Sequence, residues 1–172
     1  FVGALATVLL LAVGVVRGQL LHREIRFFAG AALLMLLYAL GSATPFFRLV
    51  FEAVPGVTLF RRPADAVFLW GALAAICAGW LVHRWWIGAI PAAGRAGLAA
   101  GAVLIALPFA VAIPLAVAKG TLGTAWPHIL TAALATLGAV AALTLLPRLR
   151  VRAPGLALVA LTAVVTLDLA LG

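Results

Sequence analysis

Six long apolar runs occupy almost all of this 172-residue chain, and nearly all of its charged residues lie between them. Hydrophobic side chains make up 67% of the sequence. A water-soluble domain of this size cannot hide so much apolar surface, because its exterior must be mostly polar. Lipid is therefore the predicted solvent. The runs are predicted to be helices rather than barrel strands, because polar and apolar residues do not alternate within them.

Charged residues and turn residues set the bounds of six predicted spans. Several are shorter than the roughly 20 residues that cross a bilayer. The first run opens at the first residue with no basic leader, so we interpret the chain as part of a longer protein. The predicted fold is all-α: one transmembrane region over residues 1–172, with six spans and a short interfacial helix. The spans are Phe1–Val16, Phe27–Gly41, Ala66–Val82, Gly97–Ala118, Pro127–Leu146 and Gly155 to about Leu171.

The net charge of +8 reports topology rather than nucleic-acid binding, because the basic residues lie in separate short loops and form no single basic face. Short loops rich in Lys and Arg stay in the cytoplasm. The loops after spans one, three and five are therefore predicted to be cytoplasmic, and both ends of the chain to lie outside. Those loops carry Arg17, Arg23, Arg26, Arg84, Arg95, Arg148, Arg150 and Arg152, whereas the alternate loops carry Arg48, Arg61, Arg62 and Lys119.

Small residues predict where helices pack closely. Gly71, Ala75 and Gly79 repeat at four-residue spacing on the third run, and Gly97 and Gly101 do so on the fourth. Small side chains let helix backbones approach one another. Both stripes are therefore predicted to face neighbouring helices.

The connection between the second and third runs is long but still apolar. Thr44 and Pro45 are typical of a helix start, with the threonine hydroxyl as N-cap and proline in the first turn, and Pro55-Gly56 is typical of a stop. The sequence predicts a short helix between them. It is too short to span and should lie in the membrane interface.

Two neighbouring arginines, Arg61 and Arg62, follow this short helix at the predicted outer surface. Their forked donors match the oxygens of a phosphate or diphosphate, so they are candidate ligands for a donor phosphate. Alternatively, they pair with Glu52, Asp65 or lipid phosphates and anchor the helix end. Asp65 either helps to shape the phosphate site or serves as a salt-bridge partner or helix N-cap.

Two further residues are secondary candidates for binding a substrate. Asp168 is predicted to lie within about a turn of the outer membrane edge; carboxylates in membranes are costly and often functional, but one near an end can reach water. His128 begins the fifth span and either contacts a substrate or is an ordinary interfacial histidine. No pair of histidines has the spacing of metal ligands, so no metal site and no catalytic residue are predicted in this chain.

The outer loop resembles that of the YfhO-type bacterial membrane proteins, which carry a Gly-x-x-Thr-Pro turn, a short apolar helix, a Pro-Gly break and a Phe-Arg-x-Pro entry to the next helix. Family members usually have an arginine soon after that last proline, whereas this chain has Asp65. An Asp-Leu pair closing the last span is matched by Asp168-Leu169. The matching loop residues are Gly41, Thr44, Pro45, Pro55, Gly56, Phe60, Arg61 and Pro63.

The resemblance implies the carboxy-terminal membrane part of a protein similar to the GT-C glycosyltransferases of the bacterial plasma membrane. Such enzymes take a sugar from a polyprenyl-phosphate donor and transfer it to a cell-envelope polymer or lipid. The partners implied are membrane lipids, that donor and that acceptor, and not nucleic acid. The catalytic carboxylate of the superfamily, and any divalent metal cofactor, would lie outside this chain.

Two other functions compete with sugar transfer. The helices form a noncatalytic scaffold or a module that binds a lipid carrier, or the chain belongs to a transporter. The transporter is disfavoured because the candidate intramembrane charge lies near a helix end and no pair of interrupted helices stands out.

Overall fold

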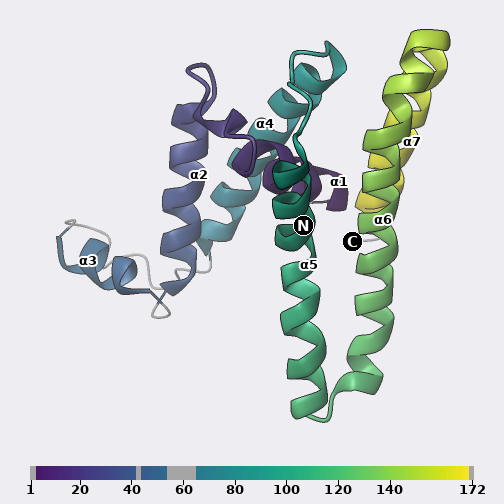
Figure 1. Ribbon diagram of the computed structural model, residues 1–172. Helices are drawn as coiled ribbons and strands as arrows, with labels where there is room; N and C mark the ends of the chain where they lie inside the picture. Colours follow the sequence, from purple (N-terminus) through teal and green to yellow (C-terminus); the bar gives the residue numbers. More distant parts are fainter. Residues whose placement is uncertain (1–2, 42–43, 54–64, 171–172) are drawn as a thin grey trace.

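The computed structural model describes residues 3–41, 44–53 and 65–170, and these residues form helices and no strand (Figure 1). The all-α prediction is therefore confirmed for this part of the chain. The elements are α1 (Ala4–Val8), the π-helix η1 (Leu9–Val15), the 3₁₀ turn η2 (Gln19–Leu21), α2 (Arg26–Ala39), α3 (Pro45–Ala53), α4 (Ala66–Trp86), α5 (Arg95–Ala118), α6 (Leu122–Arg152) and α7 (Pro154–Ala170).

Each of the six apolar runs contains a helix, but the helices differ in their capacity to cross a bilayer. Among the described residues, α4, α5 and α6 are long and apolar enough to do so by length and composition. The helices Ala4–Val15, α2 and Pro154–Asp168 are apolar but shorter. The structure therefore supports three potential spans, and six full crossings are not confirmed.

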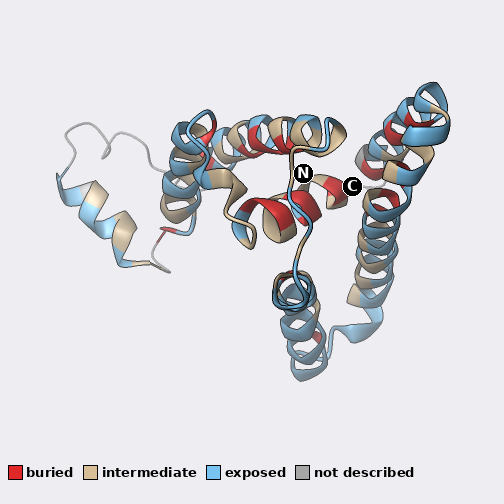
Figure 2. Cartoon of the chain, turned by 45° about the horizontal axis from the view of Figure 1, so that its top comes forward, coloured by how far each residue is buried: buried red, intermediate tan, exposed pale blue. Residues whose placement is uncertain are grey.

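The first helix, formed by α1 and η1 in succession, lies across the other long helices rather than alongside them (Figures 1 and 2). It begins beside α6 and α7 and contacts α4 and α5 further along. It contributes four of the ten residues of the buried core, and its buried part is red at the centre of Figure 2. The core consists of Leu5, Val8, Leu9, Val13, Leu81, Ala139, Ala142, Leu146, Ala157 and Leu161.

The connections gather at two opposite ends of the molecule (Figure 1). The connections from η1 to α2, from α4 to α5 and from α6 to α7 lie toward one end, which we call the arginine-rich end. Helix α3 and the turn from α5 to α6 lie toward the other, which we call the opposite end. This alternation is the one that the charge pattern predicts.

The small-residue prediction for α5 is confirmed at Gly101 but not at Gly97, where a Cβ atom would meet only Ala93 of the preceding turn, at 3.7 Å. A Cβ atom at Gly101 would lie 3.3 Å from the Cβ of Ala12, so α5 approaches η1 closely there. The stripe on α4 is wrong: a Cβ at Gly71 or Gly79 would meet nothing within 4 Å. The face of α4 that packs is a neighbouring one, which buries Ala74, Cys77, Ala78 and Leu81.

The short helix predicted in the long connection is present as α3, which begins at Pro45 as expected. The Thr44 hydroxyl donates a hydrogen bond back to the carbonyl oxygen of Leu37, at 3.2 Å, and so ties this turn to α2. Gly41 has a φ of +55°, a backbone conformation that favours glycine. Helix α3 ends at Ala53, and the predicted stop at residues 55 and 56 lies outside the described residues.

Replacing Leu9 with alanine should lower the free energy of unfolding by about 2–5 kcal/mol, because the resulting cavity at the centre would be only partly refilled. Leu9 is fully buried, whereas Leu69 on α4 is 60% exposed. The matched Leu69→Ala variant should therefore change stability by less than about 0.5 kcal/mol. Thermal unfolding in detergent measures both. Equal losses would show that α1 and η1 are not the packed centre.

Candidate functional site

A cavity of about 370 Å³ lies between α1, α5, α6 and the end of α7. Its walls are mainly apolar, but polar side chains line part of it. We call it the Asp168 cavity. Its polar lining residues are Thr7, His128, Thr131, Thr136 and Asp168.

Asp168 links α7 to the beginning of the first helix, which α1 and η1 form. One of its carboxylate oxygens, Oδ1, accepts a hydrogen bond from the backbone N–H of Ala4 at 2.9 Å, and Oδ2 accepts one from Leu5 at 2.8 Å. These donors belong to the first turn of α1, where backbone N–H groups have no partner within the helix. The carboxylate approaches so closely that a Cβ atom at Gly3 would collide with it. Asp168 therefore caps α1, and the positive end of the helix favours its charge.

The structure places Asp168 deeper in the bundle than the sequence predicts. A smaller cavity is lined by Asp168 together with Ala135, Gly138 and Ala139, so the carboxylate lies beside the middle of α6. Ala135 lies roughly 20 Å along the helix from the first residue of α6, at 1.5 Å per residue. The sequence predicts a position near the membrane edge because Asp168 is close to the end of the last apolar run. Helix α6 has 31 residues and α7 has 17, so α6 extends well beyond the end of its neighbour.

His128 is brought to the same cavity as Asp168, although 40 residues separate them in the sequence. It is exposed on α6, one turn from Thr131, whose hydroxyl donates to the His128 carbonyl oxygen at 3.0 Å. The Thr136 hydroxyl similarly donates to the carbonyl oxygen of Ala132 at 2.7 Å. With their protons used within the helix, both hydroxyls keep oxygen lone pairs that can accept a hydrogen bond from a ligand.

The predicted donor-phosphate site is not assembled in the described part of the chain. Arg61 and Arg62 lie outside the described residues. Asp65 is exposed at the start of α4, where its side chain makes no capping hydrogen bond. Glu52 pairs with Arg48 at 2.9 Å, one turn away on α3. Asp65 does not line the Asp168 cavity, so it and the two secondary candidates belong to different places.

A second cavity, of about 690 Å³, lies between η1, α5 and α6, toward the arginine-rich end. Most of its lining side chains are apolar, but Arg17 and Arg150 also line it. We call it the arginine cavity. Val8, Ile105 and Thr136 line both cavities, which are therefore neighbours. From the sequence, these arginines predicted only which loops are cytoplasmic. A cavity between helices that are distant in the chain leaves no local sequence signal, so their shared site was not predicted.

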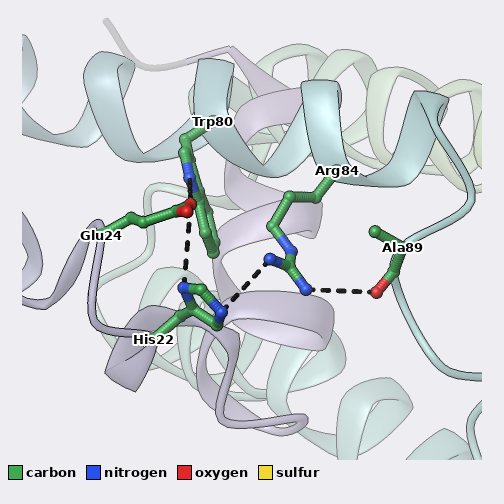
Figure 3. A network of polar contacts seen from close by, with 5 residues as sticks. All are labelled: His22, Glu24, Trp80, Arg84 and Ala89. Atoms are coloured by element: carbon green, nitrogen blue, oxygen red, sulfur yellow. Dashed lines mark hydrogen bonds and ion pairs between the residues drawn. The ribbon is translucent and has the colours of Figure 1, made fainter.

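A polar network at the arginine-rich end fastens the connection before α2 to α4 (Figure 3). Trp80 donates to Glu24 at 3.2 Å, and Glu24 lies 3.8 Å from the Nδ1 atom of His22. Arg84 contacts the other ring nitrogen of His22 at 3.4 Å and donates to the carbonyl oxygen of Ala89 at 3.3 Å. Its guanidinium also lies 5.0 Å from the centroid of the Trp80 ring. These residues hold a loop in place rather than line a cavity.

The described residues contain no group of three or more His, Cys, Asp or Glu side chains that could hold a metal ion. Comparison of the chain with models of protein families, with curated proteins and with solved structures found no match. The resemblance to YfhO-type proteins therefore stays a prediction.

Replacing Asp168 with alanine should lower the free energy of unfolding by about 1–3 kcal/mol, because two backbone N–H groups lose their acceptor in apolar surroundings. Asparagine has one acceptor oxygen and should lose less. The exposed Asp65 makes no such contact, so Asp65→Ala is the matched control and should leave stability unchanged. Thermal unfolding in detergent distinguishes these outcomes. Equal stability of Asp168→Ala and the parent protein would contradict a capping role.

Proposed function

We propose that this chain is the membrane-embedded part of a sugar-transferring protein and that it holds the sugar of a lipid-linked donor in the Asp168 cavity. The observation that carries this proposal is the chemistry of that cavity. Apolar walls enclose a carboxylate, a histidine and threonine hydroxyls contributed by α1, α6 and α7.

The exposed surface supports residence in a membrane. Helices α4, α5 and α6 are long and apolar enough to cross, and large apolar side chains are exposed along them, including Phe68, Val103 and Leu137. In this proposal the three long helices cross a bacterial plasma membrane. The shorter α2 and α7 complete the bundle around the first helix, which α1 and η1 form. The chain then has three full spans rather than six. The arginine-rich end faces the cytoplasm, as short basic loops do.

Hydroxyl groups are the ligand chemistry that suits the Asp168 cavity best. Each carboxylate oxygen of Asp168 accepts one backbone N–H bond and retains lone pairs for a further donor. Because the end of α1 already favours the negative charge, a cation is not needed beside it. A cavity of about 370 Å³ falls within the usual range for small-molecule sites. A sugar offers several hydroxyls that both donate and accept.

The remaining parts of the transfer reaction are assigned from the sequence. Arg61, Arg62 and Asp65, the phosphate ligands predicted from the sequence, are not assigned to this donor, because its sugar and phosphate are directly bonded and Asp65 does not line the Asp168 cavity. The acceptor is a cell-envelope polymer or lipid. The group that activates it belongs to a part of the protein outside this chain, as the resemblance implies.

Replacing His128 with alanine should weaken binding of a polyprenyl-phosphate-linked hexose by about two- to tenfold, the loss expected for one hydrogen bond. Binding of polyprenyl phosphate without the sugar should not change, because His128 is assigned to the sugar. His83→Ala is the matched control, since His83 is exposed on α4 near the arginine-rich end. Microscale thermophoresis in detergent measures the affinities of the parent protein and both variants for the two lipids. A loss of affinity of equal size for both lipids would show that the sugar does not bind in this cavity.

Membrane orientation can be tested with single cysteines introduced into a Cys77→Ala background. A cysteine at Thr58 should react with an impermeant maleimide on intact cells, whereas one at Arg152 should react only after the cells are opened. The physical reason is the excess of arginine in the loops near Arg152, which keeps them in the cytoplasm. The reverse pattern would place the proposed sugar site in the wrong half of the membrane.

A noncatalytic scaffold is the second candidate, and one observation favours it. Both oxygens of Asp168 are already bonded to the backbone of α1, which is enough to explain a buried carboxylate structurally. Under this alternative His128→Ala leaves the affinities for both lipids unchanged.

A further inference from the structure

We infer that the arginine cavity is a binding site for an anionic phospholipid of the cytoplasmic leaflet, with an acyl chain in the cavity and the phosphate on Arg17 and Arg150. This site is separate from the proposed sugar site and lies toward the other end of the molecule. The inference does not depend on sugar transfer.

The cavity combines an apolar body with two cationic side chains. Its volume is about 690 Å³, and its lining comes from η1, α5, α6 and the turn between α4 and α5. Leu9, Val13, Ile105 and Leu143 are among the apolar lining residues. The apolar lining matches the polarity of an acyl chain. The space between the helices of a bundle is also a common place for a ligand site.

Arg17 lies two residues after the end of η1 and is half-buried. One of its terminal nitrogens donates to the carbonyl oxygen of Pro91 at 3.2 Å, which directs the guanidinium to the turn beside the cavity. Its Nε atom is buried and has no hydrogen-bond partner. The buried Nε atom is closed to an external ligand, so a phosphate oxygen would bind the terminal nitrogens of the guanidinium.

Arg150 reaches the same turn from α6. Its terminal nitrogen would lie 3.6 Å from a Cβ atom at Gly88, which is an ordinary van der Waals distance, so the guanidinium lies against this turn. The guanidinium carbon is 5.9 Å from the centroid of the Trp86 ring, a contact that orients the side chain without neutralising it. The turn that contains Gly88 and Pro91 is thus contacted by one arginine on each side.

Neither arginine has an acidic partner among the residues that the structure describes. The ion pairs among the described residues join His22 to Glu24 and Arg48 to Glu52. The chain has four carboxylates, and the other two are Asp65, at the start of α4, and Asp168, on the backbone of α1. Two cations beside an apolar cavity therefore call for an anion from outside the chain.

An anionic phospholipid satisfies both halves of the cavity. Arg17 belongs to the connection from η1 to α2 and Arg150 to the last turn of α6, and both elements lead to the arginine-rich end, which is the predicted cytoplasmic end. Anionic lipids give the cytoplasmic leaflet its negative surface potential, and basic pockets between helices on that side bind anionic head groups. A soluble phosphate would leave the apolar part of the cavity unfilled.

The test is native mass spectrometry of the purified protein in detergent with equal amounts of phosphatidylglycerol and phosphatidylcholine. We expect the parent protein to retain phosphatidylglycerol preferentially. Replacing both Arg17 and Arg150 with glutamine should reduce that retention by about tenfold or more, since each basic residue contributes to attraction of the anionic head group. The matched control is Arg23→Gln with Arg26→Gln, two exposed arginines of the same end that do not line the cavity.

A second variant tests the cavity with both arginines intact. Ala102 lines the cavity and is exposed, so Ala102→Phe should fill the space without disturbing the core and should also reduce retention of phosphatidylglycerol. Glycerol phosphate, which has the anion but no acyl chain, should not displace the lipid. The inference is overturned by equal retention of the two lipids, by loss of equal size in the Arg23 and Arg26 control, or by unchanged retention in the Ala102 variant.

Discussion

Two hydrogen bonds from the backbone of α1 to the carboxylate of Asp168 fix how the ends of the described chain meet. The first backbone N–H groups of a helix have no partner within it, and in apolar surroundings leaving them unpaired costs several kcal/mol. A carboxylate at that point satisfies two of them at once. Because Asp168 belongs to α7, the need to satisfy α1 also sets where α7 ends against α6.

The direction of the first helix explains why two cavities lie next to each other. The helix lies across the bundle, so α5 and α6 cannot pack against one another along their whole length (Figures 1 and 2). The spaces on its two sides share Val8, Ile105 and Thr136 as lining residues. One space receives a carboxylate and a histidine, the other two arginines. The orientation of the first helix thus separates the cavity proposed for hydroxyl groups from the cavity proposed for an anion.

The pattern of apolar residues predicted every long helix and the short α3, because hydrophobic runs and turn residues act locally. It did not predict which helices are long enough to cross a bilayer or which one is central, since an apolar run looks the same whether lipid or protein surrounds it. The same limit explains the stripe of Gly71, Ala75 and Gly79: small residues permit close approach but do not compel it. Asp168 and His128 were identified singly, but their meeting in one cavity depends on how α6 and α7 pair.

The sequence alone determined that the chain is helical, where its helices begin and end to within about six residues, and how its arginines divide between alternate connections. These properties depend on neighbouring residues and on the solvent that the composition requires. Only the tertiary structure decided that the first helix lies crosswise, that Asp168 lies deep beside the middle of α6, and that Arg17 and Arg150 share a cavity. Those properties depend on contacts between residues far apart in the chain, for which the sequence carries no local signal.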